Sequence, residues 1–331
     1  MNISFWIKAL KVIPRISKNE WEKLDFISKW LVLTRSAVFV ITLIPSIIVA
    51  IYSFINDKFN LLNWILLTIG LILAHAVNNM LNDYTDYLKG VDKDNYFRAK
   101  YGPHVLEHEL MTKSEFFKYL VITGILAILI GIYFIYLRGI YAFILFIIGS
   151  FFVLFYTFPL KYIGLGELSV LIVWGPLMIG GGYYVVTGEW NLNIILMSFI
   201  YSLGATSVLF GKHIDKYEQD KSKRIRTFPV IVGEKNARIL NLIIIALQYI
   251  LTIFLVIIGF FKITMLIVLI GLYWYFKRVF VVYTKPKPIK PPENYPKEAW
   301  PLWYVAFAFD HNKKFGYLFT LGLIFELIFR I

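Results

Sequence analysis

The sequence contains no cysteine, which excludes disulfides, thiolate nucleophiles and zinc sites built from thiolates. It is also poor in charged residues, which occupy 17% of its 331 positions, whereas soluble domains average roughly 25%. Hydrophobic residues make up 59% of the chain and aromatic residues 18%. Ile, Leu and Phe come in long runs, and a helix needs about 20 such residues to cross a bilayer. The composition therefore predicts an all-α, polytopic membrane protein.

Nine apolar runs are candidates for transmembrane helices, and no second packed domain is indicated over 1–331. The runs lie at 36–54, 61–81, 116–137, 140–158, 168–186, 194–210, 239–259, 263–282 and 315–329. The last run is short, so a helix that begins earlier, near Leu302, is an alternative. The stretch 283–314 is rich in Pro and Lys and is predicted to form a connector between the last two spans.

The distribution of basic residues predicts the orientation of these spans. If the N-terminus is cytoplasmic, all but four of the 34 Lys and Arg residues lie on the cytoplasmic side, the exceptions being Lys58, Arg138, Lys262 and Arg330. Membrane proteins concentrate Lys and Arg in cytoplasmic loops. The same bias accounts for the net charge of +13 without a nucleic-acid partner. Residues 1–35 are basic and amphipathic, and we expect them to lie along the membrane surface rather than form a cleavable signal.

An acidic cluster follows the second apolar run. If the helix continues past the run, Asn82, Asp83 and Asp86 have the spacing that places their oxygen atoms on one helical face. Gly90 allows the chain to turn, so Asp92 can approach the same point. A second acidic cluster, the second motif, follows the sixth run and contains Asp215, Glu218 and Asp220.

These clusters predict a magnesium site that binds a diphosphate. Carboxylates at a membrane boundary repel one another unless a cation neutralises them. Oxygen ligands without Cys or His suit Mg²⁺, which is usually held by one or two carboxylates together with substrate phosphates. Nearby Lys89, Lys221 and Arg224 would steady the charge on the phosphates.

Other interpretations of the clusters remain open. A single polar helix end is usually only a solvated interface, but two on one membrane face, each followed by a long basic loop, weaken that interpretation. A cation transporter also carries acidic residues in the membrane, although these acids lie at span ends and no inverted repeat is visible. A CDP-alcohol phosphotransferase would have Asp-Gly after the first acidic pair, whereas Tyr87 and Leu88 follow Asp86.

Three ordered motifs carry a family resemblance. The first is Asn-Asp-Tyr-Thr-Asp at 82–86, continued by Lys-Gly-Val-Asp at 89–92. The second surrounds Asp220 and continues through Thr227, Pro229 and Gly233, and the third comprises 156–159, 164–167 and 175–176. Together they resemble the UbiA superfamily of intramembrane aromatic prenyltransferases, and in particular the 1,4-dihydroxy-2-naphthoate prenyltransferases.

The resemblance implies nine transmembrane helices around a central cavity, in the cell membrane, with the active site on the cytoplasmic side. It implies Mg²⁺-dependent transfer of a polyprenyl group from a polyprenyl diphosphate to an aromatic acceptor. A quinone precursor such as 1,4-dihydroxy-2-naphthoate, used in menaquinone synthesis, is the expected acceptor. A glycerol-phosphate lipid or a tetrapyrrole is the alternative.

The residues that match the motifs are expected to form the site, within a bundle embedded in membrane lipid. The expected catalytic residues are Asp83, Asp86, Asp215 and Asp220. The expected metal ligands are Asn82, Asp83, Asp86, Asp92, Asp215, Glu218 and Asp220. The expected diphosphate-binding residues are Arg35, Lys89, Lys161, Lys221 and Arg224.

Two positions depart from the family pattern. Ser36 stands where the family often has proline after Arg35. Asp215 precedes Asp220 by five residues rather than four, which rotates it by about 100° on an ideal helix. Either the helix end is irregular, or Glu218 takes part of the role of Asp215.

Overall fold

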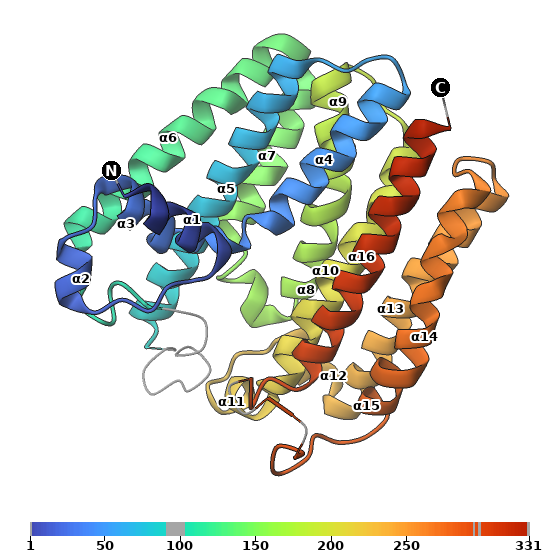
Figure 1. Cartoon of the computed structure of the whole chain (residues 1–331). Coiled ribbons are helices and arrows are strands. Elements are labelled where there is room, and N and C mark those ends of the chain that lie inside the picture. Colours follow the sequence, from blue (N-terminus) through green and yellow to red (C-terminus); the bar gives the residue numbers. More distant parts are fainter. Residues whose placement is uncertain (1, 91–102, 294, 297–298, 330–331) are drawn as a thin grey trace. The chain divides into compact units, whose positions relative to one another are not determined.

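The computed structural model of the chain describes residues 2–90, 103–293, 295–296 and 299–329. These residues form helices and turns, with no strand among them, which confirms the all-α prediction (Figure 1). The helices are α1 (Ile3–Lys11), α2 (Lys18–Glu22), α3 (Phe26–Leu33), η1 (Ser36–Val38), α4 (Val40–Ile55), α5 (Leu61–Leu88), α6 (Lys113–Arg138), α7 (Ile140–Phe155), η3 (Leu160–Ile163), α8 (Gly166–Ile172), η4 (Val173–Gly181), α9 (Gly182–Thr187), α10 (Leu192–Asp215), α11 (Tyr217–Ser222), α12 (Phe228–Val232), α13 (Glu234–Ile257), η5 (Ile263–Gly271), α14 (Leu272–Trp274), η6 (Tyr275–Phe280), α15 (Val281–Tyr283) and α16 (Tyr304–Ile328).

The apolar helices make this an integral membrane protein. Within the described part of the chain, seven helical segments are long and apolar enough to cross a membrane: Ser36–Ile55, Leu61–Leu88, Lys113–Arg138, Gly166–Thr187, Leu192–Asp215, Glu234–Ile257 and Ile263–Tyr283. They coincide with seven of the nine predicted runs. A shorter apolar helix, α7, coincides with an eighth. The total of nine spans and the cytoplasmic N-terminus stay predictions.

The last helix begins much earlier than the run 315–329 predicted. It starts at Tyr304, close to the alternative start near Leu302. Its first turns carry polar residues such as His311, which hide the helix from a search for apolar runs. The imidazole of His311 is buried and shares a hydrogen bond of 2.7 Å with the Tyr249 hydroxyl on α13. Packing inside the bundle therefore explains the polar residues that hydropathy treats as a loop.

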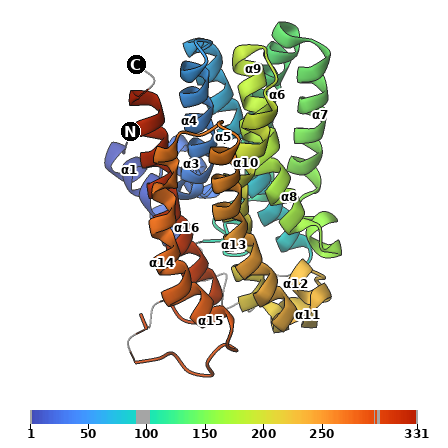
Figure 2. The same ribbon diagram turned by 90° about the vertical axis from the view of Figure 1, so that its right-hand side faces the viewer.

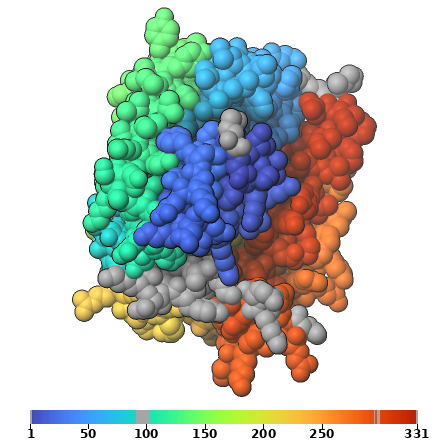
Figure 3. Space-filling view, turned by 60° about the vertical axis from the view of Figure 1, so that its left-hand side comes forward, coloured from blue at the N-terminus to red at the C-terminus, as the bar shows by residue number. Residues whose placement is uncertain are grey.

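The described helices form two compact units. Unit 1 comprises Met1–Ile47 and Leu61–Phe158, so it holds α1 to α3, η1, the start of α4, and α5 to α7. Here α5 packs against α6 and α7, and the N-terminal helices cover part of the unit's surface (Figure 3). Helix α1 buries Ala9 but exposes Ile3, Ile7 and Leu10, together with basic residues at its end. This exposed face agrees with a segment that lies along a membrane surface.

Unit 2 comprises Ile48–Asn60 and Pro159–Ile331. Its central helix is α10, which packs against α8, η4, α13 and α16, and the helices α13, α14 and α16 run side by side (Figure 2). Small residues allow these helices to approach closely. A Cβ atom at Gly211 of α10, for example, would lie 2.9 Å from the backbone of Val305. This close packing sets the position of the C-terminal end of α10, where the second motif begins.

Candidate active site

The first motif lies on the last turns of α5, in unit 1. The helix runs without a break to Leu88, so Asp83 and Asp86 have the helical spacing that the sequence predicts. Both side chains are buried, with 2% and 6% of their surface exposed. Asp83 forms an ion pair with Arg35, which stands at the start of η1 with φ 55°. Two expected site residues far apart in the sequence are thus brought together directly.

The Asn side chains of the first motif turn their NH₂ groups toward the protein. Nδ2 of Asn82 donates to the Thr157 hydroxyl at 3.0 Å, and Nδ2 of Asn79 donates to the Thr34 carbonyl at 2.9 Å. An amide that has committed its donors in this way keeps its carbonyl oxygen as an acceptor or metal ligand. Asn82 and Asp86 are one turn apart, so their oxygens can serve the same cation.

The surroundings of the first motif include a basic side chain and a histidine. Lys89 lies with Nζ 3.6 Å from the centre of the Phe158 ring, a cation–π contact at the end of α5. Nε2 of His104 lies 3.0 Å from the backbone oxygen of Asp83 and shares a hydrogen bond with it. This contact was not expected, because His104 stands 21 residues away from its partner. The predicted ligand Asp92 lies outside the described residues.

The second motif lies around the short helix α11, in unit 2. Asp220 is buried, with 1% of its surface exposed, and its Oδ1 lies 3.5 Å from Nζ of Lys216. Its Oδ2 has no hydrogen-bond partner among the described residues. The same is true of Oγ1 of Thr227, which is also buried. Polar atoms buried without a partner are costly and mark places where a ligand is expected.

Asp215 has a different role from the one its place in the motif predicts. Its carboxylate accepts hydrogen bonds from the backbone N–H groups of Trp303, Tyr304 and Val305, at 2.8, 3.1 and 3.0 Å. It also pairs with Nζ of Lys287 at 3.3 Å. The carboxylate therefore caps the start of α16 and holds the connector before it. This arrangement argues against Asp215 as a metal ligand, since its oxygens are already occupied by donors.

The connector that precedes α16 also makes a hydrogen bond close to the residues that contact Asp215. The Tyr295 hydroxyl donates to the carbonyl of Leu302. Burial, with a smaller contribution from the charge of Asp215, raises the pKa of Tyr295 to about 12. The phenol therefore keeps its proton at neutral pH and remains a hydrogen-bond donor. The stretch predicted as an extended connector thus has defined contacts in its described part.

The remaining expected residues of unit 2 are divided between surface and interior. Glu218, Lys221 and Arg224 are exposed, so Glu218 does not join the buried group around Asp220. Lys161 is buried on the turn η3. Because α11 directs Glu218 outward, the alternative that it replaces Asp215 as a ligand has no support in this geometry.

The third motif contacts the helices on either side of the second motif. Glu167 of α8 is buried, and its Oε1 lies 2.6 Å from Nδ1 of His213 near the end of α10. Its other oxygen accepts from the backbone N–H of Phe228 at 3.4 Å. A single carboxylate therefore ties α10 to the start of α12. Glu167 belongs to the third motif, but the sequence predicts no role for it.

The packing of Gly164, in the third motif, against α12 can be tested by substitution. This glycine has φ +83°, and a Cβ atom there would collide with Cδ1 of Ile231 on α12. We expect Gly164→Ala to cost about 1–2 kcal/mol for the backbone conformation and roughly 1–3 kcal/mol more for the displaced Ile231. The melting temperature in detergent should fall. Gly259→Ala is the control, because Gly259 has φ +76° but no atom within 4 Å of the added Cβ. Equal losses in the two variants would contradict a packing role for Gly164.

The donor atoms decide which motif fits a magnesium ion. Among the described residues, no group of three or more His, Asp or Glu side chains lies close enough to hold a metal by itself. The first motif offers two buried carboxylates and an Asn oxygen, which fits Mg²⁺ that takes its other ligands from water and phosphate. The second motif offers one buried carboxylate, Asp220, with Lys216 beside it, so it supplies fewer oxygen ligands than the first motif.

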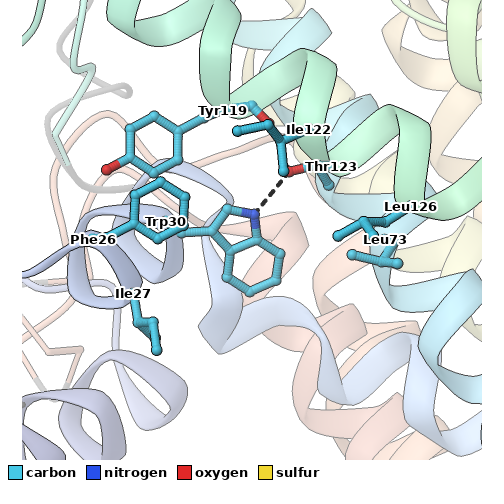
Figure 4. A pocket seen from close by; sticks show the side chains of 8 residues that line it. All are labelled: Phe26, Ile27, Trp30, Leu73, Tyr119, Ile122, Thr123 and Leu126. Atoms are coloured by element: carbon cyan, nitrogen blue, oxygen red, sulfur yellow. Dashed lines mark hydrogen bonds between the residues drawn. The ribbon is translucent and has the colours of Figure 1, made fainter.

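A cavity of about 200 Å³ lies in unit 1 between α3, α5 and α6 (Figure 4). Its lining is almost wholly apolar, and Nε1 of Trp30 donates to the Thr123 hydroxyl across it at 2.9 Å. Leu73 carries the contribution of α5 and lies roughly 220° around the helix from Asp86. The cavity therefore lies on the other side of α5 and is not part of the first motif.

Comparison with known proteins gives the family. Residues 39–305 match the model of the UbiA prenyltransferase family. The 1,4-dihydroxy-2-naphthoate octaprenyltransferase of Haemophilus influenzae is 30% identical over 198 residues, which cover 57% of this chain and 63% of that protein, less than two thirds of its length. The protein of the same name from Bacillus subtilis is 22% identical over 298 residues, covering 88% and 91%.

Solved structures support the fold. A UbiA homologue from Archaeoglobus fulgidus, bound to DMAPP and Mg²⁺, matches with a TM-score of 0.56 and 16% identity, covering 88% of this chain and 99% of that one. The match with the family model spans most of the chain and includes 82–86 and Asp220. The predicted family resemblance is thereby confirmed, and the chain belongs to the UbiA prenyltransferase family.

Proposed function

We propose that this protein transfers a polyprenyl group from a polyprenyl diphosphate to an aromatic acceptor in a Mg²⁺-dependent reaction. The observation that carries the proposal is the burial of Asp83 and Asp86 on one face of α5, at the end of a membrane-spanning helix. Carboxylate oxygens without Cys or His beside them are the ligands that suit Mg²⁺, which takes its other ligands from water and phosphate. The Mg²⁺ bound with DMAPP in the Archaeoglobus fulgidus homologue supports the same choice of ion and donor.

The acceptor we propose is a quinone precursor such as 1,4-dihydroxy-2-naphthoate, which places the reaction in menaquinone synthesis. The names of the Haemophilus influenzae and Bacillus subtilis relatives support this acceptor. The sequence at 82–92 resembles the same group of enzymes. We further propose that the protein lies in the cell membrane with the motifs on the cytoplasmic side, because that orientation places nearly all basic residues inside.

The reaction breaks the allylic C–O bond of the donor, and the bonding electrons leave with the diphosphate. A ring carbon of the acceptor then bonds to the allylic carbon, and a base removes the ring proton. Bound Mg²⁺ would supply positive charge to the leaving diphosphate. Asn82, Asp83 and Asp86 would hold the ion, and Arg35 keeps one of these carboxylates in place. The apolar helices would exclude water, which would otherwise quench the allylic cation.

The basic residues have separate proposed roles. Lys89, directly after α5, is exposed and would meet a phosphate oxygen at the first motif. Lys221 and Arg224 are exposed and would attract an anionic donor to the second motif. Lys161, buried on η3, is the remaining candidate for a direct phosphate contact.

The test is a transfer assay with purified full-length protein in detergent. Geranylgeranyl diphosphate and Mg²⁺ are incubated with one acceptor at a time, and mass spectrometry identifies the products. The acceptors are 1,4-dihydroxy-2-naphthoate, 4-hydroxybenzoate, a tetrapyrrole and a glycerol-phosphate lipid. We expect a prenylated naphthoate product that disappears when EDTA removes the metal. Transfer to another acceptor alone would reassign the substrate, and ion flux into proteoliposomes without any transfer would favour a transporter.

A further inference from the structure

The second motif contains three acidic residues, but the structure makes only one of them available. Asp215 accepts three backbone hydrogen bonds at the start of α16 and pairs with Lys287. Glu218 points to the surface. Asp220 alone is buried with an oxygen, Oδ2, that has no hydrogen-bond partner among the described residues. A divalent cation at this motif would have a single carboxylate ligand from the protein.

A lysine lies beside the one available carboxylate of the second motif. Lys216 stands one helical turn before Asp220, and its Nζ lies 3.5 Å from Oδ1 of Asp220. Its side chain is only 12% exposed, so the ammonium group is held in the interior of the motif rather than in solvent. Residues four apart on a helix lie on one face. The ammonium and Asp220 are therefore presented to the same ligand.

We propose that Lys216 is the cation of the second motif: its ammonium group binds a phosphate oxygen of a prenyl diphosphate directly, so this motif adds no divalent cation to the one proposed for the first motif. This inference rests on the proposed function. Lysine is a common partner of phosphate and acts as a compact point charge. A divalent cation placed beside this ammonium would be repelled by it, whereas a phosphate oxygen is attracted.

Two further residues of the second motif have proposed roles beside that of Lys216. Oγ1 of Thr227 is buried without a partner among the described residues, and its hydroxyl can donate to a phosphate oxygen. Asp220 holds the ammonium group through Oδ1 and so acts as a positioning residue. The pair also lowers the net charge of the motif, which prevents a lone buried carboxylate from repelling the diphosphate.

The first measurement counts the divalent ions. Full-length protein in detergent is titrated with Mn²⁺ in the presence of an unreactive thio analogue of geranyl diphosphate, and free Mn²⁺ is read by electron paramagnetic resonance. We expect one analogue-dependent Mn²⁺ per wild-type chain. Lys216→Asp, which creates a pair of carboxylates one turn apart, should bind two. Lys235→Asp makes the same change of charge at an exposed position on α13 and should bind one.

The second measurement is the affinity for the analogue. Removing a hydrogen bond to a charged group costs a factor of roughly 10 to 100, so Lys216→Ala should weaken binding by that factor, and Lys216→Arg should restore much of it. Two Mn²⁺ ions on the wild-type chain, or unchanged affinity in Lys216→Ala, would overturn this inference alone. If neither the analogue nor analogue-dependent Mn²⁺ binds to the wild-type protein, the proposed function fails with it.

Discussion

Asp86→Asn is expected to lower the rate of prenyl transfer by about 10²–10³-fold, because it weakens the binding of the Mg²⁺ that would stabilise the departing diphosphate, and losing one preorganised stabilising group at a developing anion usually costs this much. The amide has almost the shape of the carboxylate, so packing around this buried position on α5 is retained. The lost quantity is the negative charge that would bind Mg²⁺. The measurement is the initial rate of transfer at increasing Mg²⁺, and the half-saturating Mg²⁺ concentration should rise together with the fall in maximal rate.

Asp57→Asn is the matched control for this result. Asp57 is exposed in the turn after α4 and has φ 56°, a conformation that Asn also tolerates. The same loss of charge there should leave both the rate and the Mg²⁺ requirement unchanged. Full activity of Asp86→Asn would remove the first motif from the chemistry. A fall in activity that follows a lower melting temperature, without a change in the Mg²⁺ requirement, would make Asp86 structural instead.

The features that the sequence predicts correctly depend on residues that are close together along the chain. The run at 61–81 and the helical spacing of Asn82, Asp83 and Asp86 predict one uninterrupted helix, and α5 extends from Leu61 to Leu88. Nothing in this stretch breaks a helix, and a span with a polar end is typical of membrane interfaces. The ion pair between Lys216 and Asp220 was not among the predictions, although a spacing of four residues on a helix is a local signal for such a pair.

The features that the sequence does not predict depend on distant partners. The three N–H groups that Asp215 caps are 88 to 90 residues away along the chain, so no local pattern distinguishes this cap from a metal ligand. Glu167 and His213 are 46 residues apart and form a buried pair for which spacing carries no signal. The early turns of α16 contain His311, which is buried inside unit 2, beside polar residues that are exposed in part, and a scale that measures only hydropathy assigns these turns to a loop.

Asp215→Ala is expected to destabilise the protein by about 3 kcal/mol, because it removes a helix cap and leaves several donors without their charged acceptor. Three backbone N–H groups at the start of α16 and the Lys287 ammonium all depend on this carboxylate. The measurement is thermal unfolding in detergent, read by circular dichroism. Asp310→Ala is the control on the same helix, since its partly exposed pair with Lys314 should contribute less than about 1 kcal/mol.

Asp215→Asn separates a cap from a metal ligand. The amide keeps one acceptor oxygen for the N–H groups but loses the charge that pairs with Lys287, so its melting temperature should lie between those of the wild type and Asp215→Ala. At a temperature where the variant is folded, its half-saturating Mg²⁺ concentration should match that of the wild type, because we propose residues of α5 as the ligands of the ion. A tenfold higher Mg²⁺ requirement with an unchanged melting temperature would return Asp215 to the metal site.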